Sequence, residues 1–217
     1  MPDAAVTDLA GHLPANPPAG SAAVHTSGLL GLAALAAARD RGWATGAFHP
    51  LRPFPSPQPP AAFQGITIAV DASGPDLLQQ LTELAGRLGA HARRVTDDQR
   101  SLYHAAAVLG SNYAVALAAE ASGALEEIGW TRDEALAALL PLLRGAVDSL
   151  QADGLPQALT GPIRRGDDRA VRAHLHALSG SSRARVYRIL GLAALQVARE
   201  GGLDEEAARQ IEEALTG

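Results

Sequence analysis

Residues 102–129 read LYHAAAVLGSNYAVALAAEASGALEEIG, a mostly apolar stretch that predicts one long helix and decides the fold of the chain. It carries His104, Ser111 and Asn112. At about 100° per residue, positions seven and eight apart return to nearly the same side of a helix, so the three side chains share one face. Such a helix is a candidate wall of a small-molecule site. The alternative is that these polar groups only bond to neighbouring elements.

Short strands are predicted before this helix. The most regular is GITIAVD, residues 65–71, which alternates and is rich in β-branched residues. The other predicted strands are Ala22–Thr26, Ala44–His49 and Ala90–Val95, and the predicted intervening helices are Leu29–Asp40 and Pro75–Leu88. The first part of the chain is therefore expected to be an α/β layer with a sheet of about four strands.

Only helices are predicted from residue 97 onward. Thr131 and Glu134 have the spacing of a capping box, and Asp167 or Asp168, Ser181 or Ser182, and Asp204 are candidate helix starts. The expected fold class is α/β followed by all-α, with an α/β domain over residues 1–98 and a helical domain over residues 99–217.

Composition excludes several function classes. The net charge is −5, and the 18 basic residues form no continuous stripe, which argues against a nucleic-acid partner. The chain has no cysteine, so thiolate catalysis and disulfides are ruled out. No apolar run of ~18 residues is free of charged residues, glycine and proline, and the N-terminus lacks a signal-peptide pattern, so we expect a soluble cytoplasmic protein without a membrane span.

Two histidines are expected at strand ends. His25-Thr26-Ser27-Gly28 is a strand-to-helix turn whose free backbone N–H groups would suit an anion or a carbonyl, and His49-Pro50 ends the next strand near Arg52. If these strands are neighbours, both imidazoles open onto one edge of the sheet. Either histidine would equally suit an interior position with satisfied hydrogen bonds.

Other residues extend the candidate site. His104 would exchange a proton with a substrate oxygen or nitrogen, and Asn112 would orient the substrate. The loop of residues 159–167 carries Thr160 and two arginines. This loop either extends into a site or only connects two helices. His174 and His176 are two apart on a helix and face apart, so no metal site is predicted.

No glycine-rich GxGxxG turn and no P-loop motif occurs in the sequence.

Four motifs in order, VHTSG, GAFHPLRPF, LYHAAAVLGSNY and ALTGPIRRGD, resemble a Rossmann-like oxidoreductase family whose C-terminal part is the domain of unknown function 2520. The family is similar in plan to ketopantoate reductase, pyrroline-5-carboxylate reductase and the 6-phosphogluconate dehydrogenase group. The resemblance implies a partial Rossmann-like sheet, a helical domain like the C-terminal domain of 6-phosphogluconate dehydrogenase, an NAD(P) cofactor and a homodimer through the helical domain.

The resemblance also implies roles for particular residues. His104 would stand where related dehydrogenases place a catalytic lysine, with Asn112 beside the substrate. The expected catalytic residues are thus His104 and Asn112, and the expected substrate-binding residues are Ser27, Gly28, His49, Ser111 and Thr160.

The chain departs from the family at its start. Family members begin with a glycine-rich βαβ half, and this sequence resembles the part that follows, as a truncated reading frame or a natural short form. We expect the strand Ala22–Thr26 to be an exposed edge. The leading hypothesis is an NAD(P)-dependent reductase or dehydrogenase of a small polar substrate without its own complete cofactor site. The alternative is a non-catalytic helical binding or dimerisation module.

Overall fold

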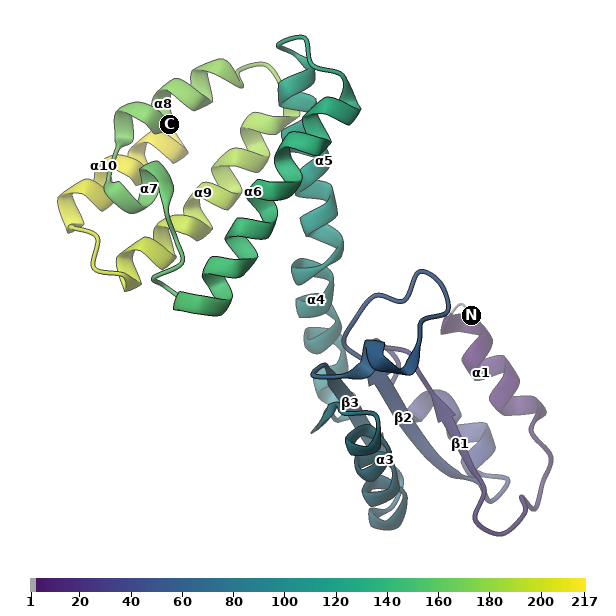
Figure 1. The fold of residues 1–217 in the computed structure, drawn as a ribbon. Coiled ribbons are helices and arrows are strands. Elements are labelled where there is room, and N and C mark those ends of the chain that lie inside the picture. Colours follow the sequence, from purple (N-terminus) through teal and green to yellow (C-terminus); the bar gives the residue numbers. More distant parts are fainter. Residues whose placement is uncertain (1–2) are drawn as a thin grey trace. The chain divides into compact units, whose positions relative to one another are not determined.

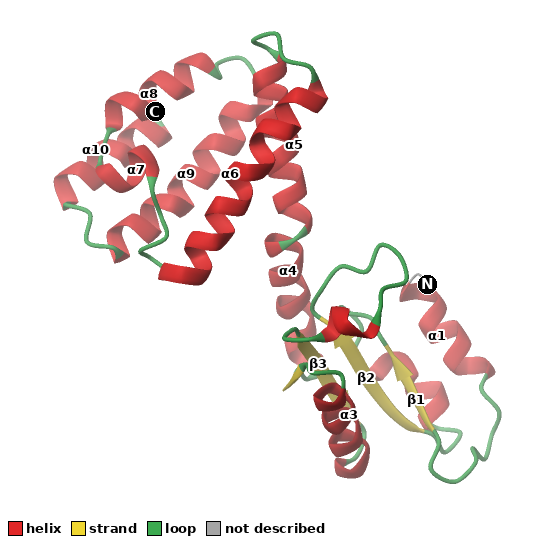
Figure 2. Ribbon diagram, in the orientation of Figure 1, coloured by secondary structure: helices red, strands yellow, loops and turns green. Residues whose placement is uncertain are grey.

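The computed structural model describes residues 3–217, and the chain forms two compact units that divide after Ala114 (Figure 1). The first unit mixes helices and strands, and the second is entirely helical in the described chain (Figure 2). This order confirms the predicted fold class, α/β followed by all-α. The domain boundary between residues 98 and 99 stays a prediction. The predicted boundary marks the point where the composition changes to helix formers. The first compact unit extends past that point to Ala114.

The first unit is built on a four-stranded mixed sheet. Its strands are β1 (Ala22–His25), β2 (Ala44–Pro50), β3 (Thr67–Ala72) and β4 (His91–Arg94). The spatial order is β1-β2-β3-β4, with β1 parallel to β2, β2 antiparallel to β3 and β3 parallel to β4. All four predicted strands are confirmed. β1 and β2 are neighbours, and β1 lies at an edge of the sheet, as expected of it.

Helices lie on both faces of this sheet. The helical segments of this unit are α1 (Asp3–His12), η1 (Leu32–Leu35), α2 (Ala36–Arg39), η2 (Pro60–Phe63), α3 (Pro75–Arg87), η3 (Asp97–Gln99) and α4 (Arg100–Gly110). In Figure 1, α3 passes in front of the strands and α2 behind them. Leu77, Leu81 and Ala85 form the buried stripe of α3 at helical spacing. A Cβ at Gly46 would lie 2.9 Å from Leu81 Cδ1, so this glycine lets α3 approach β2 closely.

The prediction of a single helix over residues 102–129 is wrong. The stretch forms α4 and α5 (Asn112–Glu126), interrupted at Ser111, whose φ of −124° and ψ of −69° are not helical. Gly110, Ser111 and Asn112 all have low helix propensity, and serine and asparagine side chains compete for backbone groups, so the break falls where three such residues meet. These helices are also more exposed than expected, since Arg100 is the only buried residue of α4.

The second unit contains α6 (Arg132–Asp153), α7 (Gly161–Arg165), α8 (Asp168–Ala177), α9 (Ser182–Glu200) and α10 (Glu205–Thr216). Its core joins α7 to α10 through Ile163, Val171, Leu195, Ile211 and Leu215. The local hydrogen bonds confirm the helix starts predicted at Thr131, Asp167 and Asp204, because each side chain accepts from a backbone N–H of the first helical turn.

Two helical stretches, Asp97–Glu126 and Arg132–Asp153, are long and apolar enough to cross a membrane by length and composition alone. The sequence interpretation did not count them because each contains charged residues or glycine and proline. Two such helices are weak evidence for a membrane span.

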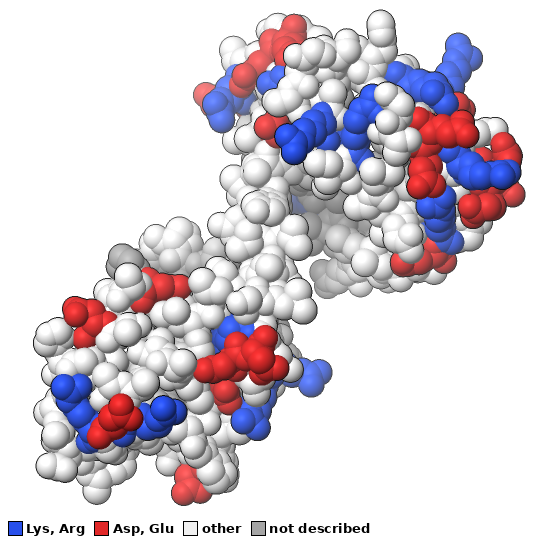
Figure 3. Space-filling model, turned by 180° about the vertical axis from the view of Figure 1, so that it is seen from behind, with Lys and Arg blue, Asp and Glu red and all other residues white. Residues whose placement is uncertain are grey.

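On the face of the molecule seen in Figure 3, acidic and basic side chains lie intermixed, and no large patch of a single charge covers it.

Candidate functional site

A cavity of about 550 Å³ lies in the first unit, between the end of β2 and the helix α4. Much of its wall is apolar, formed by residues such as Ala107 and Val108. Its polar lining residues are His49, Arg52, Tyr103, His104, Ser111 and Asn112. The structure therefore brings together four side chains that the sequence placed in a candidate site, His49, His104, Ser111 and Asn112.

Local structure explains this convergence. His49 lies at the carboxyl end of β2, next to Pro50. A capping box formed by Thr96 and Gln99 starts the helical turn η3 that leads into α4. Because His104 and Ser111 are seven positions apart on this segment, both reach the cavity, and the break at Ser111 does not remove them from it.

The central contact of the cavity is between His49 and Tyr103. The Tyr103 hydroxyl lies 2.8 Å from His49 Nδ1, and the two rings meet edge to face at 5.6 Å between centroids. The ring of His104 lies 6.4 Å from that of His49, also edge to face. Two imidazoles and a phenol thus form one group at the cavity wall, a set of side chains suited to holding and transferring protons.

Gly28 closes this group from the side of β1. A Cβ on this buried residue would lie 2.7 Å from His104 Nδ1 and 2.9 Å from His49 Nε2. Real Cβ atoms essentially never come this close to a neighbour, so any larger residue at position 28 would require the imidazoles to shift. Gly28 therefore lies beside His49 and His104, and its expected role in substrate binding stays a prediction.

The turn after β1 does not have the free N–H groups expected of it. Ser27 Oγ accepts from the backbone N–H of Leu29 at 3.2 Å and of Leu30 at 3.0 Å. The Asp97 carboxylate accepts from Leu32 N at 2.7 Å and from Ala33 N at 3.1 Å. The prediction of an open anion site is wrong for these four groups, because the chain's own oxygens already occupy them.

Burial sets the electrostatics around the cavity. It lowers the pKa of His49, and the charges of His104 and Arg100 act in the same direction. It also lowers the pKa of His25, whose Nε2–H donates to the carbonyl oxygen of Gly31 at 3.1 Å. The pKa of the Tyr103 hydroxyl is raised by burial. At neutral pH these effects favour uncharged His49 and protonated Tyr103.

Arg100 was not singled out in the sequence, yet it is the most deeply buried charged side chain near the cavity, 1% exposed. One guanidinium nitrogen, Nη1, lies 3.4 Å from the carbonyl oxygen of Ser27. Within residues 3–217, its Nε and Nη2 have no hydrogen-bond partner. Burial lowers its pKa, and the nearby Asp71 opposes that effect.

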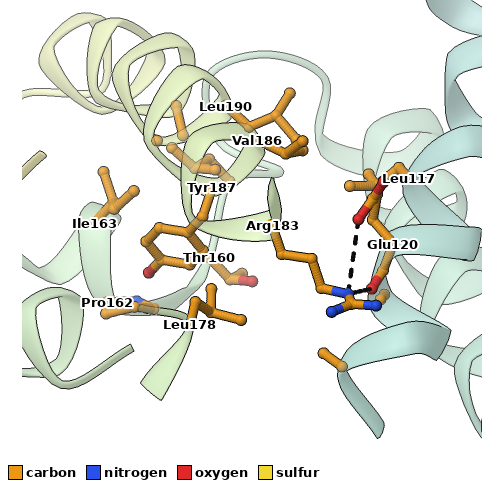
Figure 4. A pocket seen from close by; sticks show the side chains of 15 residues that line it. Leu117, Glu120, Thr160, Pro162, Ile163, Leu178, Arg183, Val186, Tyr187 and Leu190 are labelled. Carbon is orange, nitrogen blue, oxygen red and sulfur yellow. Dashed lines mark hydrogen bonds and ion pairs between the residues drawn. The ribbon is translucent and has the colours of Figure 1, made fainter. Parts of the chain in front are cut away.

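The remaining predicted residues lie elsewhere. Ser27 uses its hydroxyl within its own turn, and His25 is an interior residue bonded to Gly31. Thr160 lines a different cavity, in the second unit, together with Arg183 and Tyr187 (Figure 4). Tyr103 was not among the predicted site residues. Its position next to His104 in the sequence was the one feature that indicated it.

No group of three or more His, Asp or Glu side chains that could hold a metal ion occurs within residues 3–217.

The model of a family described as a domain of unknown function, DUF2520, matches residues 66–194, more than half of the chain. No curated protein matches. The resemblance stated from the motifs is therefore confirmed at the level of the family.

Solved structures show the same fold. Protein TM1727 from Thermotoga maritima is 24% identical, with a TM-score of 0.74 over 93% of this chain and 77% of that one. The "putative NADP oxidoreductase" BF3122 from Bacteroides fragilis is 21% identical, with a TM-score of 0.68 over 98% and 73%. Pyrroline carboxylate reductase from Plasmodium falciparum, solved with NADP bound, is 9% identical, with a TM-score of 0.51 over 99% and 77%. The fold is thus that of Rossmann-like reductases.

Proposed function

The chain belongs to the DUF2520 family, and we propose that it carries the substrate-facing part of a reductase or dehydrogenase site that acts on a small polar carbonyl or imine compound in the cytoplasm. The observation that supports this most strongly is the cavity of about 550 Å³, which is lined by His49, Tyr103, His104 and Asn112. Such a cavity, apolar with a few convergent polar groups, is typical of small-molecule sites.

In this proposal His104 is the proton donor or acceptor. Its Nδ1 is enclosed beside Gly28, which leaves Nε2 as the ring nitrogen available to exchange a proton with the substrate oxygen or nitrogen. Asn112 offers one donor and one acceptor to orient the substrate, and Ser111 adds a hydroxyl. His49, kept uncharged by burial and held by Tyr103, binds the substrate rather than carrying charge.

NAD(P)H would supply the hydride when bound; NADP is named for the Bacteroides fragilis protein and was bound in the Plasmodium falciparum reductase. The turn after β1 does not fit the pyrophosphate of that cofactor, because Ser27 and Asp97 already accept from its N–H groups. We therefore assign no cofactor contact to this turn.

The same observation favours a second candidate, a non-catalytic module that keeps the cavity and binds a small polar ligand without a dinucleotide. The two candidates differ in one measurable property, namely whether the chain binds NADPH.

The test is calorimetric titration of the purified chain with NADPH, followed by NADPH oxidation assays with 2-oxo acids and cyclic imines. Saturable micromolar binding with turnover supports the reductase. No binding at millimolar NADPH, with binding of a 2-oxo acid retained, supports the non-catalytic module.

The role of His104 is tested in the same assay. His104→Ala is expected to lower turnover about 100- to 10,000-fold, the range of general acid–base contributions. His12→Ala, on the exposed face of α1, is the matched control and should leave turnover unchanged. Equal turnover of His104→Ala and wild type would show that His104 is not the acid or base.

A further inference from the structure

A buried positive charge lies next to the cavity of the first unit. Arg100, at the start of α4, is 1% exposed, and an arginine stays charged at every pH at which proteins are folded. Its Nη1 lies 3.4 Å from the carbonyl oxygen of Ser27, and its Nε and Nη2 have no hydrogen-bond partner within residues 3–217. Most of the hydrogen-bonding capacity of this guanidinium is therefore unused.

The acidic residues near Arg100 are bonded to other groups. Asp71 Oδ1 accepts from Arg94 Nε at 3.0 Å, and Asp97, which is exposed to water, accepts from two backbone N–H groups of the turn after β1. Among the described residues, Arg100 forms no ion pair. Because a buried charge without a paired charge costs free energy, an anion placed near Arg100 would be stabilised.

Arg100 lies against the face of the sheet that carries His49. His25 on β1 pairs with Ala47 on β2, so their side chains share one face, and His49, two positions further along β2, shares it too. Burial lowers the pKa of both histidines, and the charge of Arg100 acts on both in the same direction. The charge is therefore felt at the end of β2, where the cavity begins.

On α4, Arg100 lies one helical turn before Tyr103 and His104. Both of these residues line the cavity, at positions three and four after Arg100, where the side chains of a helix are neighbours. Four residues of helix rise about 6 Å, so a ligand held beside His104 would lie within about 10 Å of the guanidinium. Arg100 is not among the residues that line the described cavity, so it acts on a ligand through its charge rather than by contact.

No acidic residue opposes this charge at the cavity wall. Of the described residues that line the cavity, none is Asp or Glu, and Arg52 is the one arginine. Arg52 is exposed, so water screens its charge. Asp3, an exposed residue of α1, acts on His49 in the opposite direction but less than Arg100 does. The potential in the cavity is therefore positive, and its main source is a charge that water does not screen.

We propose that Arg100 makes the cavity select a carboxylate over an uncharged compound of the same shape. This inference rests on the proposed function, because it names the substrate class of that site. One uncompensated positive charge matches a monoanion, whereas a phosphate dianion would leave surplus negative charge beside a largely apolar wall. Among small carbonyl compounds, the matching monoanion is a 2-oxo acid.

The expected selectivity follows from Coulomb's law. Across about 10 Å, at an effective dielectric constant of about 20, a unit charge strengthens the binding of a monoanion about 15-fold. Removal of the charge of Arg100 should abolish this factor. Removal of the charge of Arg52, which water screens, should change it less than about threefold.

The test is calorimetric titration of the full chain with 2-oxobutanoate and with its uncharged amide. Wild type should bind the acid about 15-fold more tightly than the amide. In Arg100→Met, and in Arg100→Gln, which keeps a donor for the Ser27 carbonyl, the two ligands should bind with about equal affinity, whereas Arg100→Lys keeps the charge and should retain most of the preference. Arg87→Met, at an exposed arginine of α3, is the control and should show the wild-type preference.

The ratio of the two affinities separates an electrostatic role from a structural one, because a loss of folded chain weakens the apparent binding of both ligands equally. Equal binding of acid and amide by wild type would overturn this inference alone, and binding of neither at millimolar concentration would overturn the proposed function with it. A preference that survives in Arg100→Met or Arg100→Gln would show that another group sets it. Inorganic phosphate that displaces 2-oxobutanoate at equal concentration would contradict the choice of a carboxylate.

Discussion

The substitution Gly28→Ala tests the packing of the candidate site directly. The added Cβ would lie 2.7 Å from His104 Nδ1 and 2.9 Å from His49 Nε2, which is 0.7 and 0.5 Å short of the 3.4 Å where ordinary contact begins. Both imidazoles must move, and overpacking of this kind costs about 1–3 kcal/mol. We expect the free energy of unfolding to fall by that amount in urea titrations, and the ring resonances of both histidines to shift in NMR spectra.

A matched control is Gly86→Ala, on the exposed side of α3, where no atom lies within 4 Å of the new Cβ. Replacing glycine inside a helix should there stabilise the protein by about 0.5–1 kcal/mol. If Gly28→Ala unfolds at the same urea concentration as wild type and leaves both imidazole resonances in place, the close packing of Gly28 between the two rings is wrong.

Further predictions concern pH and two capping contacts. Burial holds the pKa values of His25 and His49 below 6.5, so the unfolded chain takes up protons first, and stability should be complete above pH 6.5 and decline as the pH falls below it. His49→Gln should make that decline shallower in urea titrations at several pH values, and an unchanged slope would contradict the cause given. Thr131→Ala removes the capping box of α6 and should cost about 1 kcal/mol, while Thr131→Ser should restore it in thermal unfolding. Asp97→Ala frees the N–H groups of Leu32 and Ala33, whose amide exchange with deuterium should then accelerate; equal exchange rates would rule out the cap.

Features that depend on neighbours in the sequence could be predicted. The strand over residues 65–71 follows from alternation and β-branched residues within one segment, and the helix starts at Thr131 and Asp204 follow from side chains that bond within their own first turn. The grouping of His104, Ser111 and Asn112 also follows from helical spacing, which the break at Ser111 did not disturb.

Features that depend on contacts between distant parts of the sequence could not be predicted. Asp97 occupies the turn after β1 from 65 positions away, and no local pattern indicates that contact. Tyr103 points about 100° away from His104 around the helix, so the spacing argument left it out, although its hydroxyl reaches His49 on another element. The break at Ser111 falls where three weak helix formers stand in a row. The apolar residues on both sides of them favoured the prediction of one continuous helix.

The central claim, that the cavity of His49 and His104 binds a small polar substrate, is tested most directly by NMR of the histidine rings during titration with a 2-oxo acid. We predict saturable shifts for His49 and His104, and none for His174, which lies in the second unit bonded to Tyr187. No shift of His49 and His104 at millimolar ligand, or equal shifts of His174, would contradict the account.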